Sequence, residues 1–411
     1  MKYHPPAPLP TPAVAPQRCL RIAIVGAGSA GLLLAVLLQH QGHAVTVFEK
    51  AEQLRTDGCG ILLVQAGCAA IAAAGLDGLL EEVLAAGLPV RRFVVRNLRG
   101  DQIEASPVER ADGELPSLLI PRPAIMAALA RRLEAGSLQT GSALLHWQRP
   151  AGGSSGDTAG GVEAHFADGQ VWQGDLLVGA DGLFSRVAPL LVPERRLHYL
   201  GDRVWRGVVE DASFCRDGDF YVYARGRGIY ANVFDLGKDG AGQPLTHWGL
   251  FQEEPLPESR DEQRRLLQEP LPEGALAKLP ADLAELMRRT PAEQIVANWS
   301  FDIDPLPRIT GPGLALIGDA AHAMSSSQAR GMTAGLEDAV SLAAALAQEA
   351  SLTEAASAEA ALEEVLAAYA AERLPVVHRY QERSRAVSAR TGRQRAPARQ
   401  PAPQPSASMR R

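Results

Sequence analysis

The chain has 411 residues, of which 46% are hydrophobic and 21% charged, and its formal net charge is −6. This length and composition exclude a small disulfide-stapled scaffold and a disordered chain, and are typical of one large or two to three modest globular domains. The four cysteines, Cys19, Cys59, Cys68 and Cys215, show no CxxC spacing. We therefore expect a cytoplasmic protein with reduced thiols and no bound metal.

The charge is unevenly distributed along the chain. Eight arginines and no acidic residue follow Glu382, so residues 1–382 carry a net charge of −14. An acidic body repels a polyphosphate backbone, and we expect no nucleic-acid partner. Segment 392–411 is predicted to be a basic disordered tail, with a docking segment as the alternative. The proline-rich residues 1–17 are predicted to be a disordered leader, because they lack the apolar core of a signal peptide.

The first predicted elements lie in the uncharged stretch 22–38. Its length approaches that of a membrane span, but a glycine-rich turn interrupts it. Residues 22–25 are typical of a short buried strand, and residues 32–41 of a buried helix that ends at Gly42. We therefore expect no transmembrane segment, and a peripheral contact with a membrane stays open.

This strand, turn and helix match the GxGxxG dinucleotide-binding unit. Gly26 permits the tight turn, Gly28 lets the backbone approach a pyrophosphate, and Gly31 allows the helix to pack closely on the strand. A second predicted strand, 44–48, ends at Glu49, whose carboxylate can accept hydrogen bonds from a ribose. The unit predicts a site for NAD or FAD, with a βαβ unit that binds no nucleotide as the alternative.

Two later motifs narrow this choice. Residues 176–182 read LLVGADG, an apolar strand that runs into Asp181. Residues 314–322 read LALIGDAAH, an apolar strand that ends at Asp319 and is followed by a long helical pattern. With three motifs in this order, the chain from about Cys19 to about Ser384 resembles the class A flavoprotein monooxygenases. These are single-component aromatic hydroxylases with the para-hydroxybenzoate hydroxylase fold.

The resemblance implies an α/β fold. A Rossmann-like FAD-binding domain would carry an inserted, mostly antiparallel β-sheet substrate domain, and C-terminal helices would follow. The residues that match the family's FAD-binding motifs are Gly26, Gly28, Ala30, Gly31, Glu49, Arg122, Asp181, Gly318, Asp319, Gly331 and Met332, with Arg55 as a further flavin-side candidate. Of these, Glu49 would bind the adenosine ribose and Asp319 the ribityl chain, while Asp181 matches a residue implicated in both FAD and NAD(P)H binding.

By the same resemblance the protein is an FAD-dependent monooxygenase. NAD(P)H would reduce the flavin, O2 would add to it, and the flavin hydroperoxide would hydroxylate or epoxidise an apolar small molecule, aromatic or isoprenoid-like. No protein nucleophile is required. The alternatives are an FAD-dependent reductase or saturase of the same superfamily and a non-catalytic flavin-binding protein.

The sequence departs from the family pattern after His322. Where the family has prolines and a Gly-Gln-Gly step, this chain has Ser325 to Gln328 and then Ala329-Arg330-Gly331. We expect these residues to make the rim of the flavin site more polar. Arg330 would either lie near the isoalloxazine and raise its reduction potential, or turn outward to a carboxylate. His322 is expected to be a packed, hydrogen-bonded histidine.

Three of the flavin-side candidates also have structural alternatives. Asp181 and Asp319 would in that case cap the turns that follow their strands, and Arg122 would pair with a surface carboxylate.

Between about 197 and 252 the chain changes to short strands separated by turns. Ten of its 21 aromatic residues lie in this segment. The predicted strands are 200–209, 220–225, 228–235 and 246–252. They suit a sheet that covers an apolar pocket over the flavin, with Arg206, Tyr230 and His247 as polar groups. Tyr230, His247 and Arg330 are the only protein groups considered for catalysis, the first two as the base for a phenolic substrate.

The expected organisation follows from these elements. The FAD-binding domain would comprise residues 18–196 and 301–350, with the substrate sheet inserted at 197–300. C-terminal helices are predicted at 351–391, in two parts that divide before Pro375. The Gly/Ser-rich residues 150–161 are predicted to be a flexible surface loop between two strands.

Overall fold

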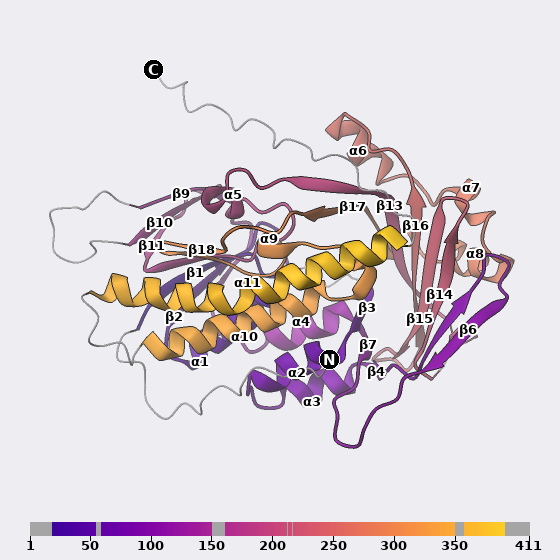
Figure 1. The fold of residues 1–411 in the computed structure, drawn as a ribbon, viewed down its shortest axis with the longest axis horizontal. Helices are drawn as coiled ribbons and strands as arrows, with labels where there is room; N and C mark the ends of the chain where they lie inside the picture. The colour runs from indigo at the N-terminus through magenta and orange to yellow at the C-terminus, as the bar shows by residue number, and fades with distance from the viewer. Residues whose placement is uncertain are drawn as a thin grey trace.

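The computed structural model describes residues 19–54, 59–149, 161–211, 213–215, 217–349 and 357–390. The predicted leader, the predicted tail, Arg55 and almost all of the predicted loop 150–161 lie outside the described residues. The architecture is the predicted one: a largely parallel sheet with helices, a second and mainly antiparallel sheet, and C-terminal helices (Figure 1).

A six-stranded sheet holds all three sequence motifs. Its strand order is β18-β19-β12-β1-β2-β8. The strands are β1 (Arg21–Val25), β2 (Ala44–Phe48), β8 (Leu138–Gln139), β12 (Leu176–Gly179), β18 (Thr310–Gly311) and β19 (Leu314–Leu316). β1 pairs in parallel with both β2 and β12, and β12 pairs in parallel with β19. The strands that precede the three motifs are therefore neighbours, and their carboxyl ends lie at one edge of the sheet.

Helix α1 (Ser29–His40) is apolar on almost every side, and ten of its residues are buried. It packs against α4 (Arg122–Ala130) and α10 (Gly331–Glu349), and α10 in turn contacts α2 (Gln65–Ala73), beside which α3 (Leu79–Ala85) lies. A helix without a polar face has to be covered all round, so α1 lies at the centre of the largest hydrophobic cluster.

Two small sheets complete this half of the molecule. The first consists of β9 (Leu144–Gln148), β10 (Val162–Phe166) and β11 (Val171–Gly174), and β9 and β10 are the strands that flank the predicted loop. The second consists of β3 (Gly60–Leu63), β7 (Leu118–Pro121) and β4 (Leu88–Pro89). The short helix α5 (Ala188–Leu191) follows the second motif, and the short helix α9 (Asp319–His322) forms the end of the third.

The second large sheet has seven strands in the order β17-β13-β16-β15-β14-β5-β6. The four predicted strands are observed as β13 (Leu197–Glu210), β14 (Asp219–Gly226), β15 (Ile229–Lys238) and β16 (Pro244–Glu253). β17 (Ile295–Ile303) pairs with β13. The sequence did not predict that β5 (Arg92–Arg96) and β6 (Gln102–Pro107), from the first half of the chain, extend this sheet through a parallel pairing of β5 with β14.

The two faces of the seven-stranded sheet have different neighbours. One face packs on α7 (Glu273–Leu276) and α8 (Ala281–Arg288) around Trp205 and Trp248, and α6 (Arg260–Leu266) lies at the end of the sheet (Figure 1). Phe220 and Phe234 lie on the other face, where they pack with Leu62 of β3 and Leu119 of β7. This second face is therefore turned toward the six-stranded half of the molecule.

Helix α11 (Ala358–Arg390) is continuous, and the predicted division before Pro375 is wrong. Proline removes one helical N–H, which leaves the carbonyl of Ala371 without its usual donor. Both Ala371 and Pro375 are exposed, so water can replace the missing bond. α11 runs alongside α10 across the molecule (Figure 1). No helix in the described part of the chain is both long and apolar enough to cross a membrane.

Candidate cofactor and substrate site

The three motif turns touch one another at the carboxyl edge of the six-stranded sheet. The backbone N–H of Gly26 donates to the carbonyl of Phe48 (2.8 Å), and that of Ala180 donates to Val25 (2.8 Å). A Cβ built on Gly26 would lie 2.4 Å from the carbonyl oxygen of Ala180, so only glycine fits there. Gly26 also has a φ of +109°, a conformation that favours glycine.

The glycine-rich turn leaves room for a ligand at the start of α1. A Cβ built on Gly31 would lie 2.2 Å from the carbonyl oxygen of Gly26, which shows how closely the helix approaches the turn. By contrast, a Cβ built on Gly28 meets nothing within 4 Å. α1 begins after Gly28 without a side-chain cap, so its first amides are left for another acceptor. Ala30 is buried in this first turn. This geometry fits a pyrophosphate.

Glu49 lies at the end of β2 beside this turn. Its Oε2 accepts a hydrogen bond from the N–H of Ala27 (2.9 Å) and its Oε1 accepts one from the N–H of Ala51 (3.0 Å). These bonds fix the carboxylate, and each oxygen retains capacity for a further donor such as a ribose hydroxyl. The position fits the expected role of Glu49.

Asp319 projects from buried backbone. It is exposed, whereas Gly318 and Ala320 on either side are buried. Its Oδ1 lies 3.6 Å from a Cβ built on Gly331, so the carboxylate faces the start of α10, where Gly331 and Met332 are half-buried. Within the described ranges, no side chain or backbone group hydrogen-bonds to this carboxylate. An Asp319 that points away from its own turn fits a ligand hydroxyl better than it fits a turn cap.

Asp181 does make the bonds of a turn cap. Its carboxylate accepts hydrogen bonds from Ser185 Oγ (2.5 Å) and from the N–H groups of Arg186 (2.6 Å) and Val187 (3.3 Å). Burial raises the pKa of Asp181, and these bonds oppose the shift. Arg195 is buried nearby and donates to the carbonyl of Leu183 (2.7 Å). Burial lowers the pKa of Arg195, and the charges of Asp181 and Asp319 oppose this shift. No motif in the sequence marked Arg195.

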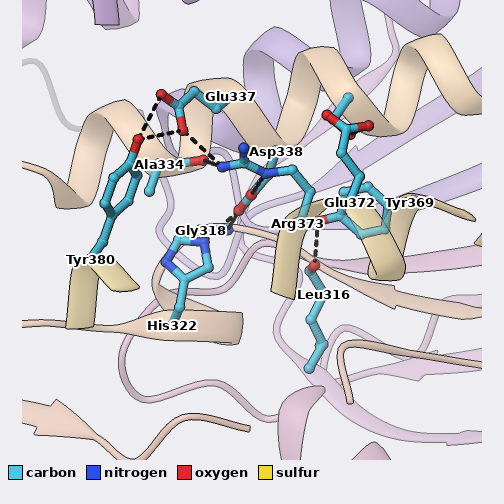
Figure 2. Close-up of polar contacts among 11 residues, drawn as sticks. Leu316, Gly318, His322, Ala334, Glu337, Asp338, Tyr369, Glu372, Arg373 and Tyr380 are labelled. Carbon is cyan, nitrogen blue, oxygen red and sulfur yellow. Dashed lines mark hydrogen bonds and ion pairs between the residues drawn. The ribbon is translucent and has the colours of Figure 1, made fainter. Parts of the chain in front are cut away.

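A buried polar network supports the turn that carries Asp319 (Figure 2). His322 is a packed histidine, as predicted, and its Nε2 contacts Asp338 Oδ2 at 2.5 Å. The same oxygen accepts a hydrogen bond from the N–H of Gly318 (2.9 Å), and Oδ1 of Asp338 accepts one from Arg373 Nε of α11 (2.8 Å). Burial would raise the pKa of Asp338, but the positive charges of His322 and Arg373 outweigh burial and lower it to about 2.

The polar side chains that follow His322 contact α11. Ser325 Oγ hydrogen-bonds Ser388 Oγ (2.8 Å), and Ser327 Oγ donates to the carbonyl of Ser384 (2.9 Å). The guanidinium of Arg330 lies over the ring of Tyr380, with Cζ 5.3 Å from the ring centroid. Both hydroxyls therefore bond to the C-terminal helix, and their contribution to a polar flavin rim stays a prediction.

Arg122 lies at the first position of α4 and is exposed. Its backbone N–H donates to the carbonyl of Cys59 (3.2 Å), which holds the start of α4 against β3. The alternative of a surface ion pair is not formed with any carboxylate that the structure describes. Its side chain is therefore available to a ligand.

His247 does not suit the role of a general base. It is buried, and its Nδ1 accepts a hydrogen bond from the N–H of Gly60 (3.1 Å). Burial, with the charge of Arg206, lowers the pKa of His247 to about 3. The neutral ring therefore carries its proton on Nε2 and has no free lone pair. Tyr230 is half-buried and lies edge-on to Phe251, with ring centroids 5.1 Å apart. It stays a candidate.

Comparisons with known proteins agree with this geometry. Residues 20–384 match the family model described as "FAD binding domain". The chain is 31% identical over 330 residues to the aurachin C monooxygenase/isomerase of Stigmatella aurantiaca, an alignment that covers 79% of this chain and 80% of the relative. It is 30% identical over 338 residues to the 3-amino-4-hydroxybenzoate 2-monooxygenase of Streptomyces cremeus, covering 79% and 78%. A crystal structure of an HpxO variant of Klebsiella pneumoniae complexed with FAD has a TM-score of 0.72 and 25% identity, covering 90% of each chain.

Proposed function

The chain belongs to the FAD-binding-domain family and is an FAD-dependent monooxygenase that uses NAD(P)H, and we propose that it hydroxylates a flat aromatic or heteroaromatic small molecule with O2. The observation that carries this proposal is the aromatic face of the seven-stranded sheet. Phe220 and Phe234 pack in the core between this sheet and β3 and β7, whereas Tyr230 on the same face is half-buried and lies edge-on to Phe251, with ring centroids 5.1 Å apart. An aromatic face suits a flat ring better than it suits a flexible chain.

This aromatic face lies directly on the half of the molecule that carries the cofactor motifs. A Cβ built on Gly60 of β3 would lie 2.8 Å from the ring of Phe234 and 2.9 Å from Cβ of His247. Gly60 also donates its N–H to His247. The close approach supports a substrate bound between the sheet and the cofactor, where packed side chains exclude water.

The chain's own residues would divide the work of holding FAD. The start of α1 at Gly28 would bind the pyrophosphate, and Glu49 would bind the adenosine ribose. Asp319 would bind the ribityl chain, and the amides at the start of α10 would face the isoalloxazine, where their partial positive charge stabilises negative charge. When bound, FAD supplies the transfer of electrons from NAD(P)H to O2.

The names of the relatives support an aromatic substrate. One is named for 3-amino-4-hydroxybenzoate, an aromatic acid.

The test is NAD(P)H oxidation by the FAD-loaded protein in the presence of a library of aromatic and heteroaromatic compounds, in air and without oxygen. We expect at least one compound to stimulate oxidation and to gain one oxygen atom, and 18O2 should label that atom. A saturated product formed without oxygen would support the reductase alternative instead. Stimulation by acyclic isoprenoids alone would contradict the proposal.

A further inference from the structure

A polar row interrupts the aromatic face of the seven-stranded sheet. Arg206 of β13 pairs with Gly249 of β16, and Gly249 pairs with Asn232 of β15. The three residues therefore lie side by side across adjacent strands. Trp205 packs in the cluster on α7 and α8, whereas Val208 packs with Leu62 and Leu119 on the opposite face. Because side chains alternate along a strand, Arg206 lies on the face of Val208, toward the cofactor motifs.

Arg206 is a half-buried cation without a described counter-ion. Its Nη1 donates to Asn298 Oδ1 (2.6 Å), and its Cζ lies 5.5 Å from the ring centroid of Phe251. Across the described segments, no carboxylate forms an ion pair with it, and no further residue hydrogen-bonds its guanidinium. Burial lowers the pKa of Arg206. A partly desolvated charge without an anionic partner is unfavourable, and its remaining N–H groups can donate to a ligand acceptor.

Two neighbouring arginines of the same sheet show the usual solution. Arg225 pairs with Asp202 (3.0 Å), which is fully buried, and Arg203 pairs with Glu254 (2.9 Å). Carboxylates therefore neutralise the buried guanidinium groups of Arg225 and Arg203. The described partners of Arg206 are instead the neutral side-chain amide of Asn298 and the ring face of Phe251.

Within the described residues, Asn232 lacks a hydrogen-bond donor for its side-chain oxygen, just as Arg206 lacks a carboxylate partner. Its Oδ1 is buried and accepts no hydrogen bond from the residues that the structure describes. The same oxygen lies 2.8 Å from a Cβ built on Gly249. The amide therefore leans over Gly249, in the direction of the strand of Arg206, and any side chain at position 249 would displace it. A buried acceptor without a donor costs free energy, because the group has lost its hydrogen bonds to water.

We propose that Arg206 and Asn232 are the specificity-determining residues of the substrate site and that they bind opposite edges of one flat ring system. The guanidinium would donate to an anionic or strongly polarised carbonyl oxygen. The amide Oδ1 would accept a ring N–H or a hydroxyl. Phe251 and Tyr230 would contact the ring. This inference rests on the proposed function and adds the substrate class: a heteroaromatic compound with an oxygen acceptor and a hydrogen-bond donor on separate edges.

Equilibrium binding to the FAD-loaded protein, without NAD(P)H, tests this assignment. The probes are quinolin-4(1H)-one, which has both groups, its 1-methyl derivative, which lacks the donor, and quinoline, which lacks both the carbonyl and the N–H. Titration calorimetry should give the parent compound at least tenfold tighter binding than either analogue. Arg206→Gln should weaken binding of the parent about 10- to 100-fold. Asn232→Leu should weaken the parent about tenfold and leave the affinity of the 1-methyl derivative unchanged.

Arg227→Gln is the matched control, because Arg227 is an exposed arginine in the turn between β14 and β15. It should bind all three probes as the unmodified protein does. Equal affinity for the three probes, no binding of any probe, or equal losses in Arg206→Gln and Arg227→Gln would overturn the assignment. The proposed function is judged separately: aromatic compounds that stimulate NAD(P)H oxidation equally in Arg206→Gln would leave it standing while this inference fails.

Discussion

His322 Nε2 lies 2.5 Å from Asp338 Oδ2, and both side chains are almost completely shielded from solvent. Asp338 belongs to α10, whereas His322 follows the turn that carries Asp319. The same carboxylate also accepts hydrogen bonds from Gly318 and Arg373 (Figure 2). One side chain therefore joins the turn, α10 and α11.

Replacement of Asp338 should destabilise the fold. Asp338→Asn removes the negative charge between His322 and Arg373, so that Arg373 keeps one of its two buried carboxylate partners, Glu337 (2.9 Å). We expect the free energy of unfolding, measured by urea denaturation, to fall by about 1.5–3 kcal/mol, the range for a hydrogen bond to a charged group. The control is Ser341→Ala on the same helix, whose Oγ donates to Glu372 (2.9 Å); it should cost about 1 kcal/mol. Equal effects of the two substitutions would contradict a special role for the Asp338 network.

The same carboxylate should contribute to acid stability. Burial opposes ionisation, but His322 and Arg373 hold the pKa of Asp338 at about 2, below its ordinary value of 3.8. A lowered pKa in the folded state means that the contribution is complete above pH about 4 and is lost as the pH falls toward 2. Denaturant unfolding at several pH values should show a smaller loss of stability between pH 4 and pH 2 in Asp338→Asn than in the unmodified protein. Parallel pH profiles would refute this assignment.

Asp319→Ala should weaken FAD binding without unfolding the protein. The carboxylate is exposed beside the start of α10 and is bonded to no described group, so its loss breaks no described contact. Loss of a carboxylate–hydroxyl hydrogen bond lowers affinity roughly 10- to 100-fold. Titration of the apoprotein with FAD, followed by flavin fluorescence, measures this loss. Asp181→Asn is the comparison, because it should lower the melting temperature of the apoprotein. An unchanged FAD affinity in Asp319→Ala would assign Asp319 to the turn alone.

Arg330 should affect the docking of α11 more than the cofactor. Its guanidinium lies over Tyr380, whose hydroxyl donates to Glu337 (3.3 Å). We expect Arg330→Gln to lower the free energy of unfolding by about 1 kcal/mol. The reduction potential of the bound FAD, measured by dye titration, should differ between Arg330→Gln and the unmodified protein by less than about 10 mV. Tyr380→Leu, which removes the ring and keeps the charge, should produce a similar loss of stability. A fall of some tens of millivolts in Arg330→Gln would show instead that the charge acts on the isoalloxazine.

Ala329→Gly should stabilise the protein. Ala329 has a φ of +52°, a left-handed conformation that glycine adopts without steric cost. The relief of strain exceeds the greater chain entropy of unfolded glycine, so we expect a gain of about 0.5–1 kcal/mol in urea denaturation. Arg227, with a φ of +53°, provides the matched position, and Arg227→Gly should give a similar gain. A loss of stability in Ala329→Gly alone would show that the methyl group makes a necessary contact.

Local patterns predicted most of the residues that form the candidate cofactor site. The pattern formed by Gly26, Gly28 and Gly31 lies within one strand–turn–helix unit, and Asp319 follows a strand whose apolar residues are adjacent in sequence. The four strands between 197 and 253 were predictable for the same reason, since each is a short segment of strand-forming residues that ends at a turn. In these cases the information lies within a few residues.

Features that depend on distant contacts were not predictable in this way. β5 joins the seven-stranded sheet only through pairing with β14, more than a hundred residues later. Ser325 and Ser327 face α11 because of where that helix docks, which the local sequence does not encode. The separation of Arg206 from every described carboxylate likewise results from the pairing of distant strands. No sequence motif identified Asn232.

The continuity of α11 limits how the two large sheets can move relative to each other. Near its middle, Arg373 is bonded to Asp338, and near its end Arg385 is bonded to Asp302 of β17 (3.0 Å). Because α11 is held at both positions, the two sheets cannot separate on this side unless α11 bends or one of these contacts breaks. Pro375 lies between these two contacts and removes one backbone hydrogen bond there. The resistance of α11 to bending is therefore lowest between these two contacts.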